Sequence, residues 1–213
     1  MIIDERLAVY IDTLAQENTE ILNQIEKEAL ASDVPIIRRE MQSFLKVLLA
    51  LHKPAKILEV GAAVGFSAIL MAEYNPADCR ITTIENYEKR IPIARENFRR
   101  AGKERQITLV EGDAANVLKD LDEEFDFIFM DAAKAQYIYF LPEVLRLLKT
   151  GGVLLSDNVL QDGEIIESRY LVIRRNRSIH RRMREYLYLL THHECLRTSV
   201  LPVGDGIALS VKC

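Results

Sequence analysis

The sequence contains no tryptophan, only three cysteines and no long uninterrupted hydrophobic run. Cys79, Cys195 and Cys213 lie far apart and lack CxxC spacing, which argues against a zinc site or a disulfide framework and fits a reduced compartment. No membrane-spanning helix is expected, because such a helix needs about 18 consecutive apolar residues. The first residues, MIIDERLAVYIDTLAQ, include acids where a secretory or transit peptide would carry only basic residues. We therefore expect a cytoplasmic protein.

Length and composition predict a single domain. A chain of 213 residues, 49% of them hydrophobic, can bury one sizeable core. We expect one domain over 1–213, with N-terminal helices over 1–54 and the core over 55–213. The net charge of −4 argues against a surface that is basic throughout. The charge is unevenly distributed, however, because residues 169–184, here called the arginine segment, contain seven arginines and no acid.

Apolar spacing predicts an α/β fold. Residues 4–31 show helical periodicity, with Asn18 as a possible cap of the second of two helices, and a third helix should end near Lys53-Pro54. From Lys56 onward, short apolar runs at 56–60, 80–84, 106–110, 125–130 and 152–156 alternate with helical patterns at 65–74, 87–101, after 110, and 136–149. A long helical stretch around 162–192 precedes the hairpin-like pair LRTSVLP and GIALSVK. The prediction is a Rossmann-like, seven-stranded, mostly parallel sheet with helices on both faces and an antiparallel last strand.

A glycine loop after the first strand predicts a nucleoside site. Ligands of parallel sheets bind beyond the carboxyl ends of the strands, where Glu59-Val60-Gly61-Ala62-Ala63-Val64-Gly65 stands. Its spacing is GxxxG and differs from the GxGxxG that cradles a pyrophosphate. Glu85, after the second strand, could accept the ribose hydroxyls, and Gly112-Asp113-Ala114 could frame an adenine. Each feature alone could be a turn or a helix cap, but together they favour a nucleoside cofactor that lacks a pyrophosphate.

Polar residues follow the fourth and fifth predicted strands. Asp131 and Lys134 come after the fourth strand, and Asp157-Asn158 after the fifth. Such oxygen ligands suit a hard divalent cation, Mg²⁺ most simply, which would lower the pKa of a bound hydroxyl so that Lys134 could accept its proton. The alternative is that Asp131 caps a helix, Asp157-Asn158 forms an Asx turn and Lys134 is a solvated helix residue.

At these residues the sequence resembles the cation-dependent O-methyltransferases that include catechol and caffeoyl-CoA O-methyltransferases. The motifs are ILEVGAAVGFSA, the Asp131-x-x-Lys134-x-x-Tyr137 pattern, SDNVL and the closing PVGDGIALS. The resemblance implies Mg²⁺ or another divalent cation on Asp131, Asp157 and Asn158, and catalysis by Lys134, as the base, with Asp131. It implies that S-adenosylmethionine, the methyl donor, contacts Ile36, Glu59, Gly61, Phe66, Ser67, Glu85, Gly112, Asp113, Ala114 and Asp131.

Within that family the chain is most similar to the bacterial branch that methylates 5-hydroxyuridine at the tRNA wobble position. The shared features are Val34-Pro35-Ile36, a basic stretch after DNVL, and VGDGIALS; Gln161 stands where small-molecule members often carry tryptophan. The resemblance implies the tRNA anticodon loop as partner, no membrane, and a homodimer. Arginines of the segment would hold the phosphates that flank the modified nucleotide, and we assign this role to Arg174, Arg175, Arg177, Arg181 and Arg182.

The arginine segment also has a plainer interpretation, as a solvated helical face or a dimer contact. Tyr170, Tyr186 and Tyr188 could stack on bases, although helical spacing places some of them in the core. His180, His192 and His193 have no evident metal-ligand partners and are expected to be surface or packing residues.

Three other functions remain open at this point. The first is a methyltransferase for a small catechol-like metabolite, and the second is a tRNA-binding protein that has lost catalysis. The third, a nicotinamide oxidoreductase, is disfavoured by the missing GxGxxG.

Overall fold

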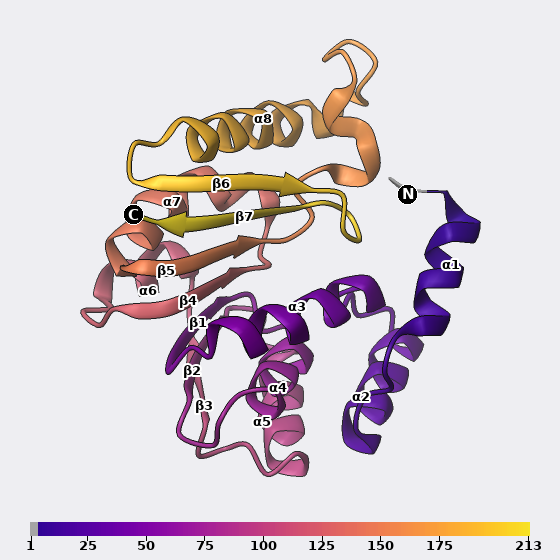
Figure 1. Cartoon of the computed structure of the whole chain (residues 1–213), viewed down its shortest axis with the longest axis vertical. Helices are drawn as coiled ribbons and strands as arrows, with labels where there is room; N and C mark the ends of the chain where they lie inside the picture. Colours follow the sequence, from indigo (N-terminus) through magenta and orange to yellow (C-terminus); the bar gives the residue numbers. More distant parts are fainter. Residues whose placement is uncertain (1–3) are drawn as a thin grey trace.

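A seven-stranded sheet lies at the centre of the computed structural model, which describes residues 4–213 (Figure 1). Its strand order is β3-β2-β1-β4-β5-β7-β6. The strands are β1 (Lys56–Val60), β2 (Arg80–Glu85), β3 (Ile107–Glu111), β4 (Phe125–Met130), β5 (Leu148–Ser156), β6 (Leu196–Leu201) and β7 (Ile207–Lys212). Strands β1 to β5 pair in parallel, and β7 pairs antiparallel with both β5 and β6. The predicted mostly parallel sheet with an antiparallel last strand is confirmed.

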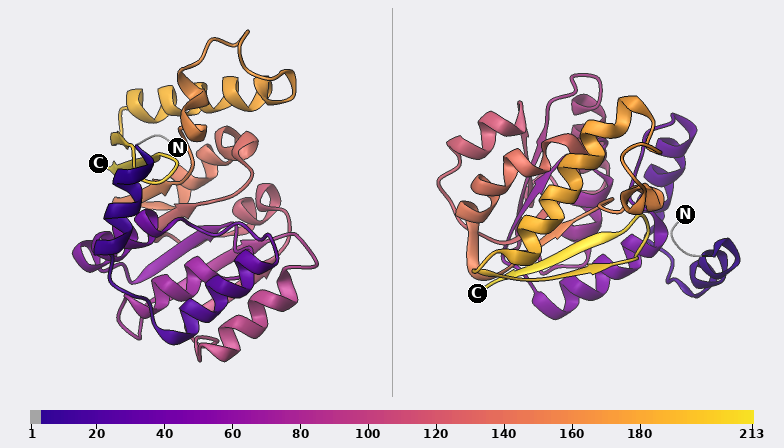
Figure 2. Two further views of the ribbon diagram at one scale, coloured as in Figure 1. Left: turned by 90° about the vertical axis from the view of Figure 1, so that its right-hand side faces the viewer. Right: turned by 90° about the horizontal axis from the view of Figure 1, so that it is seen from above.

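Helices cover both faces of this sheet (Figure 2). One face packs against α2 (Glu20–Ala31), α3 (Arg39–His52), α4 (Phe66–Glu73) and α5 (Ile91–Arg100). The other packs against α6 (Ala114–Asp120), α7 (Tyr137–Leu147) and α8 (Arg177–His192). Within β4, Phe127 and Phe129 belong to the first core, whereas Ile128 and Met130 belong to the second. The alternation follows from the two-residue period of a strand, and it explains why β4 is apolar nearly throughout.

The N-terminal helices pack on the first face through α3 and α4. Helix α1 (Glu5–Leu14) contacts α3, and α2 contacts α4. The prediction that Asn18 caps α2 is wrong, because the N-cap residue is Thr19. The Asn18 side chain instead donates a hydrogen bond to Gln42 Oε1 on α3 at 2.7 Å, which ties the linker before α2 to the third helix.

The predicted long helix around 162–192 is interrupted. Only α8 is α-helical; before it come two short 3₁₀ helices, η2 (Gln161–Ile166) and η3 (Arg174–Asn176), joined by irregular backbone. Asp162 and Gly163 have φ angles of 51° and 92°, which a right-handed helix cannot contain. No helix within the described residues is long and apolar enough to cross a membrane.

The strand register brings five strand ends to one edge of the sheet. Val60, the last residue of β1, pairs with Ile84 on one side and Met130 on the other, and Met130 pairs with Ser156. Residues that directly follow these strands therefore share one edge, as the sequence predicts for the candidate site.

Candidate active site

A cleft of about 710 Å³ opens at the carboxyl ends of β1 to β5. Ten predicted site residues line it: Ile36, Gly61, Glu85, Gly112, Asp113, Ala114, Asp131, Lys134, Asp157 and Asn158. Concave sites of this size hold small molecules and cofactors. The residues proposed for the donor and those proposed for the cation therefore share one cavity.

Glu85 is held rigidly at the end of β2. One carboxylate oxygen accepts a hydrogen bond from the backbone N–H of Ala63 at 2.7 Å, and the other accepts from Asn86 at 2.9 Å and Tyr87 at 2.8 Å. The side chain is buried but lines the cleft. A carboxylate has about four acceptor directions and three are occupied here, so the oxygen that binds Ala63 can still accept from one hydroxyl of a ribose.

Gly61 allows the loops after β1 and β4 to approach closely. A Cβ atom built on it would lie 2.1 Å from the carbonyl oxygen of Asp131, and its φ of 107° disfavours other residues. No larger residue fits here without moving Asp131. The glycine therefore places a proposed donor site directly against a proposed cation ligand.

Asp113 is both a helix cap and a residue of the cleft, the two roles that the sequence allowed. Its side chain caps α6 by accepting from the backbone N–H of Ala115 at 2.8 Å, and it also lines the cleft next to Gly112 and Ala114. The cap fixes the carboxylate beside a helix N-terminus. The position is open to an adenine or its ribose without a change in the helix.

Three predicted donor contacts lie outside the main cleft. Phe66 and Ser67 line a smaller adjoining cavity that shares Ile36, Gly61 and Asp131 with the cleft. Glu59 lines neither cavity; it is fully buried and accepts a hydrogen bond from the Thr83 hydroxyl on β2. Burial raises the pKa of Glu59 to about 7, against the opposing effect of the neighbouring Ser67 and Thr83 hydroxyls. The geometry gives Glu59 a role in the interior rather than on the cleft surface.

Tyr137 joins the strand ends that carry the two aspartates. Its buried hydroxyl donates to the carbonyl oxygens of Met130 at 3.0 Å and Asp157 at 3.2 Å. Burial raises its pKa well above the ordinary value, so the hydroxyl stays protonated as a donor. The tyrosine of the Asp131-x-x-Lys134-x-x-Tyr137 pattern thus fixes the spacing between the ends of β4 and β5.

Asp131 and Asp157 form a like-charged pair at the cleft floor. Burial raises the pKa of Asp131, and the charge of Lys134 opposes this shift. Burial, and then repulsion by Asp131, raise the pKa of Asp157, which is only 3% exposed. A cation bound between two such carboxylates would relieve both costs.

The donor set at this floor fits a hard divalent cation. Asn158 lines the cleft beside Asp157 and supplies an amide oxygen, so two carboxylates and one amide converge. Oxygen ligands of this kind suit Mg²⁺, with the remaining positions left for water and an acceptor. Within residues 4–213 no group of three or more His, Cys, Asp or Glu side chains is placed to hold a metal, and the third oxygen donor of the proposed set is the Asn158 amide.

Comparisons with known proteins agree with this geometry. A family model described as O-methyltransferase matches residues 12–213. The chain belongs to the O-methyltransferase family. A catechol O-methyltransferase of Niastella koreensis is 37% identical over 128 residues, which are 58% of each protein. A candidate caffeoyl-CoA O-methyltransferase structure from Staphylococcus aureus is 31% identical, with a TM-score of 0.91 over 98% of this chain and 100% of that one.

An O-methyltransferase from Bacillus cereus, solved in complex with S-adenosylhomocysteine (SAH), is 26% identical. Its TM-score is 0.86 over 98% of this chain and 97% of that one. The family and these likenesses make the chain an S-adenosylmethionine-dependent O-methyltransferase of the caffeoyl-CoA and catechol type. The predicted reaction and methyl donor are confirmed at this level, and the oxidoreductase alternative is excluded.

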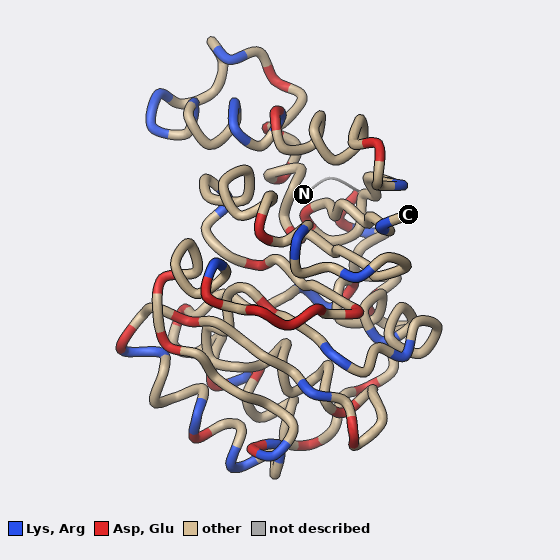
Figure 3. The backbone as a smooth tube through the Cα atoms, turned by 90° about the vertical axis from the view of Figure 1, so that its left-hand side faces the viewer, with Lys and Arg blue, Asp and Glu red and all other residues tan. Residues whose placement is uncertain are grey.

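The arginine segment of this O-methyltransferase lies beside the cleft and does not line it. Arg182 donates to the carbonyl oxygen of Ala135, next to Lys134, at 3.4 Å, and its guanidinium lies 5.1 Å from the centre of the Tyr139 ring. Arg177 and Arg184 also donate to backbone carbonyl oxygens. Arg174, Arg175 and Arg181 are exposed, and no salt bridge within the described residues involves an arginine of the segment. Basic stretches are visible in this uppermost part of the molecule in Figure 3.

The tyrosines and histidines of this region divide between core and surface. Tyr186 is fully buried and its hydroxyl lies 2.6 Å from Ser156 Oγ, so it cannot stack on a base. Tyr170 and Tyr188 are exposed, and Tyr188 stacks on the exposed His192. His180 is buried, as expected for a packing residue.

Several cleft residues were missed in the sequence. Arg38 enters the cleft from the segment before α3, while Tyr87 and Arg90 enter from the loop after β2. Only Tyr87 could have been found, from its position two residues after Glu85. A further residue, Asp205, contacts Asn158 from the distant turn between β6 and β7.

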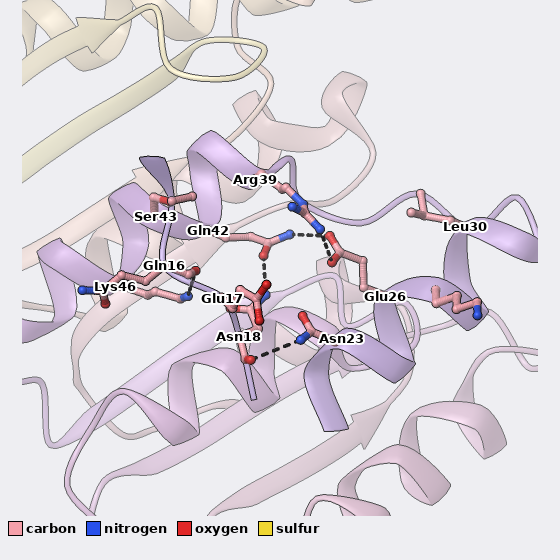
Figure 4. A pocket seen from close by; sticks show the side chains of 12 residues that line it. Gln16, Glu17, Asn18, Asn23, Glu26, Leu30, Arg39, Gln42, Ser43 and Lys46 are labelled. Carbon is pink, nitrogen blue, oxygen red and sulfur yellow. Dashed lines mark hydrogen bonds and ion pairs between the residues drawn. The ribbon is translucent and has the colours of Figure 1, made fainter. Parts of the chain in front are cut away.

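A second cavity, of about 340 Å³, lies between α2, α3 and the linker before α2 (Figure 4). It shares no lining residue with the main cleft. The buried Gln42 amide bridges its walls by accepting from Asn18 and donating to Glu26 Oε1 and the Ile37 carbonyl oxygen, both at 3.0 Å. Through these hydrogen bonds Gln42 links the linker, α2 and α3, which gives the polar side chains of this cavity a role in holding the helices together.

Proposed function

We propose that the chain methylates the 5-hydroxyl of 5-hydroxyuridine at the tRNA wobble position, in a reaction that requires a divalent cation and yields 5-methoxyuridine. One observation carries the proposal: a single cleft combines the clamped Glu85 with Asp131, Asp157, Asn158 and Lys134. Donor, cation and base sites that share one cavity suit transfer of a methyl group to a hydroxyl held on the cation.

The residues of the cleft have separate roles in this proposed reaction. Glu85 binds the donor ribose, and the segment Gly112 to Ala114 flanks the adenine. Asp131, Asp157 and Asn158 would hold a divalent cation, whose charge would lower the pKa of the acceptor hydroxyl, and the vicinal oxygens of the acceptor could chelate that cation. Lys134 accepts the hydroxyl proton. The acceptor oxygen then bonds to the methyl carbon as the sulfur to carbon bond breaks, which leaves S-adenosylhomocysteine.

The arginine segment supports a nucleic acid acceptor. Arg174, Arg175 and Arg181 are exposed, and Arg182 contacts the backbone next to Lys134, so positive charge extends from the cleft rim outward. Phosphate contacts need positive charge whatever the sequence, and a loop nucleotide can be splayed into a pocket while its neighbours are held. Such an acceptor places the reaction in the cytoplasm.

A homodimer is part of this proposal. Helix α1 leaves Leu7, Val9, Tyr10 and Leu14 between 49% and 65% exposed. Apolar surface of this kind suits burial against a second copy of the chain. Analytical ultracentrifugation is expected to give a dimer that a double change of Tyr10 and Leu14 to serine dissociates, whereas a monomeric wild type would contradict it.

A small catechol-like acceptor is the second candidate. The likeness to a catechol O-methyltransferase favours it, because a catechol presents the same vicinal oxygens to a cation. The segment would then serve solubility or dimer contacts. A tRNA-binding protein without catalysis is disfavoured, since Asp131, Lys134, Asp157 and Asn158 all stand in the cleft.

Competition between acceptors tests the proposal. The protein is incubated with labelled S-adenosylmethionine, Mg²⁺, tRNA that contains 5-hydroxyuridine, and an equimolar catechol, and the products are separated by mass spectrometry. We expect 5-methoxyuridine as the main product and none after treatment with EDTA. Methylated catechol together with tRNA whose 5-hydroxyuridine is not methylated would establish the second candidate. Absence of a methylated product from either acceptor would contradict both candidate functions.

A further inference from the structure

Asp205 links the last hairpin to the loop after β5. It lies in the turn between β6 and β7 and is buried, with 7% of its surface exposed. One of its carboxylate oxygens accepts from the backbone N–H of Asp162, and the other lies 3.4 Å from Asn158 Nδ2. A residue 47 positions from Asn158 in the sequence therefore contacts the proposed cation ligand directly.

The backbone of the same turn is fixed against this loop. Val159 donates to the carbonyl oxygen of Gly206 at 2.8 Å, and Leu160 donates to that of Asp205 at 3.1 Å. A Cβ on Gly206 would lie 2.3 Å from Leu160 Cγ, and Gly206 has a φ of 80°, so the turn can approach only as glycine. The Asp205 carboxylate consequently has little freedom to move away from Asn158.

The loop itself has an unfavourable backbone that needs such support. Asn158, Gln161 and Asp162 have φ angles of 55°, 52° and 51°, in the left-handed region. Such backbone is strained for residues other than glycine and persists only where its surroundings hold it. Asp205 bonds to two of the three, which makes it a main constraint on the loop.

We propose that Asp205 is a positioning residue that orients the Asn158 amide for cation binding. An ionised carboxylate only accepts hydrogen bonds, so the amide nitrogen must face Asp205 and the amide oxygen is left for the cleft that Asn158 lines. Outer partners of metal ligands act in this way by fixing ligand orientation. The inference rests on the proposed cation site.

A double-mutant cycle tests this orientation without relying on turnover. In Asp205→Asn, one oxygen can still accept from Asp162, but the amide nitrogen then faces the Asn158 nitrogen, so two donors oppose each other. Cation affinity should fall by about tenfold or more. In the Asn158→Asp background, the carboxylates at positions 158 and 205 face each other. The change Asp205→Asn then places an amide donor at position 205 opposite a carboxylate acceptor at position 158, so cation affinity should stay unchanged or rise.

The cycle separates geometry from charge, because Asp205→Asn removes one negative charge in both backgrounds. Binding of Mn²⁺, followed by electron paramagnetic resonance of the free ion, gives the cation affinity of all four proteins. Calorimetry with S-adenosylmethionine and thermal unfolding show whether the fold is kept, and donor affinity should stay within about twofold throughout.

Opposite responses in the two backgrounds are the expected result. Equal losses in both would overturn the role of Asp205 while leaving the proposed cation site intact. If Asp205→Asn alone fails to fold, the comparison between the double variant Asn158→Asp/Asp205→Asn and the single variant Asn158→Asp still tests the inference. The inference is supported if the folded double variant binds Mn²⁺ at least as tightly as Asn158→Asp. It is overturned if the double variant binds Mn²⁺ more weakly. A wild-type protein that binds no Mn²⁺ would overturn the cation site and the inference together.

Discussion

The Glu85 carboxylate accepts a hydrogen bond from the backbone N–H of Ala63 at 2.7 Å, which joins the end of β2 to the glycine loop after β1. With the two further amides that bind its other oxygen, Glu85 is fixed before any ligand arrives. A preformed acceptor loses little freedom on binding, so its charge contributes more fully to donor affinity.

Glu85→Gln should therefore weaken donor binding. The amide nitrogen would face at least one backbone N–H, and the charged acceptor for the ribose is lost, so we expect S-adenosylmethionine affinity to fall by about tenfold or more. Glu111→Gln is the matched control, because Glu111 ends the neighbouring strand, pairs in register with Glu85, and does not line the cleft. Calorimetry that gives equal donor affinity for Glu85→Gln and wild type would exclude this contact.

Lys134 should act in the chemical step and leave donor binding unchanged. Loss of a positioned proton acceptor typically lowers kcat by about 10² to 10⁴, so Lys134→Ala is expected to fall in that range. The donor affinity should change by less than about twofold, since Lys134 is placed beside the aspartate pair rather than Glu85. Lys89→Ala, an exposed lysine on the loop after β2, serves as control. Retained turnover in Lys134→Ala would remove the lysine from the mechanism.

The buried Glu59 should make folding stability depend on pH. The pKa of Glu59 is raised to about 7 from 4.5, so between these values the unfolded chain releases a proton that the folded chain keeps. The free energy of unfolding therefore falls by about 3 kcal/mol in total as pH rises from 4.5 to 7. Above pH 7 the contribution of Glu59 no longer changes with pH.

Glu59→Gln removes that ionisation. Denaturant unfolding at a series of pH values should show the variant gaining stability relative to wild type as pH rises through this window. The exposed Glu104→Gln should run parallel to wild type. A difference between Glu59→Gln and wild type that does not change with pH would show that Glu59 does not titrate in this range.

The exposed arginines should determine the salt dependence of tRNA binding. A triple change of Arg174, Arg175 and Arg181 to glutamine should raise the Michaelis constant for tRNA and reduce the slope of log affinity against log salt by about 0.7 for each phosphate that an arginine no longer neutralises. The control triple changes Lys53, Arg105 and Lys119, exposed residues that precede β1, β3 and β4 at the opposite edge of the sheet. Unchanged tRNA kinetics would leave the segment a structural role.

Local patterns in the sequence were sufficient to predict the sheet and the strand ends. Apolar runs gave five parallel strands, and parallel strands bring their carboxyl ends to one edge, so Glu85, Asp131 and Asp157 could be placed together in advance. The prediction of one continuous helix around 162–192 was wrong, because helical apolar spacing does not reveal the left-handed backbone at Asp162 and Gly163.

Contacts between distant segments could not be predicted in this way. Asn18 looked like a helix cap, yet Gln42 on another helix binds its side chain. Asp205 reaches Asn158 only because β7 inserts between β5 and β6, which no local spacing specifies. Such tertiary contacts depend on the strand order and therefore need the structure.

The separation of donor and cation sites within one cleft is tested most directly by calorimetry on Asp157→Ala. Asp157 follows β5, whereas Glu85 ends β2 on the other side of β1 and β4. We predict that Asp157→Ala loses detectable Mg²⁺ or Mn²⁺ binding while its S-adenosylmethionine affinity stays within about twofold of wild type. Cation binding retained at wild-type strength, or donor affinity that falls in parallel with it, would contradict this division of the cleft.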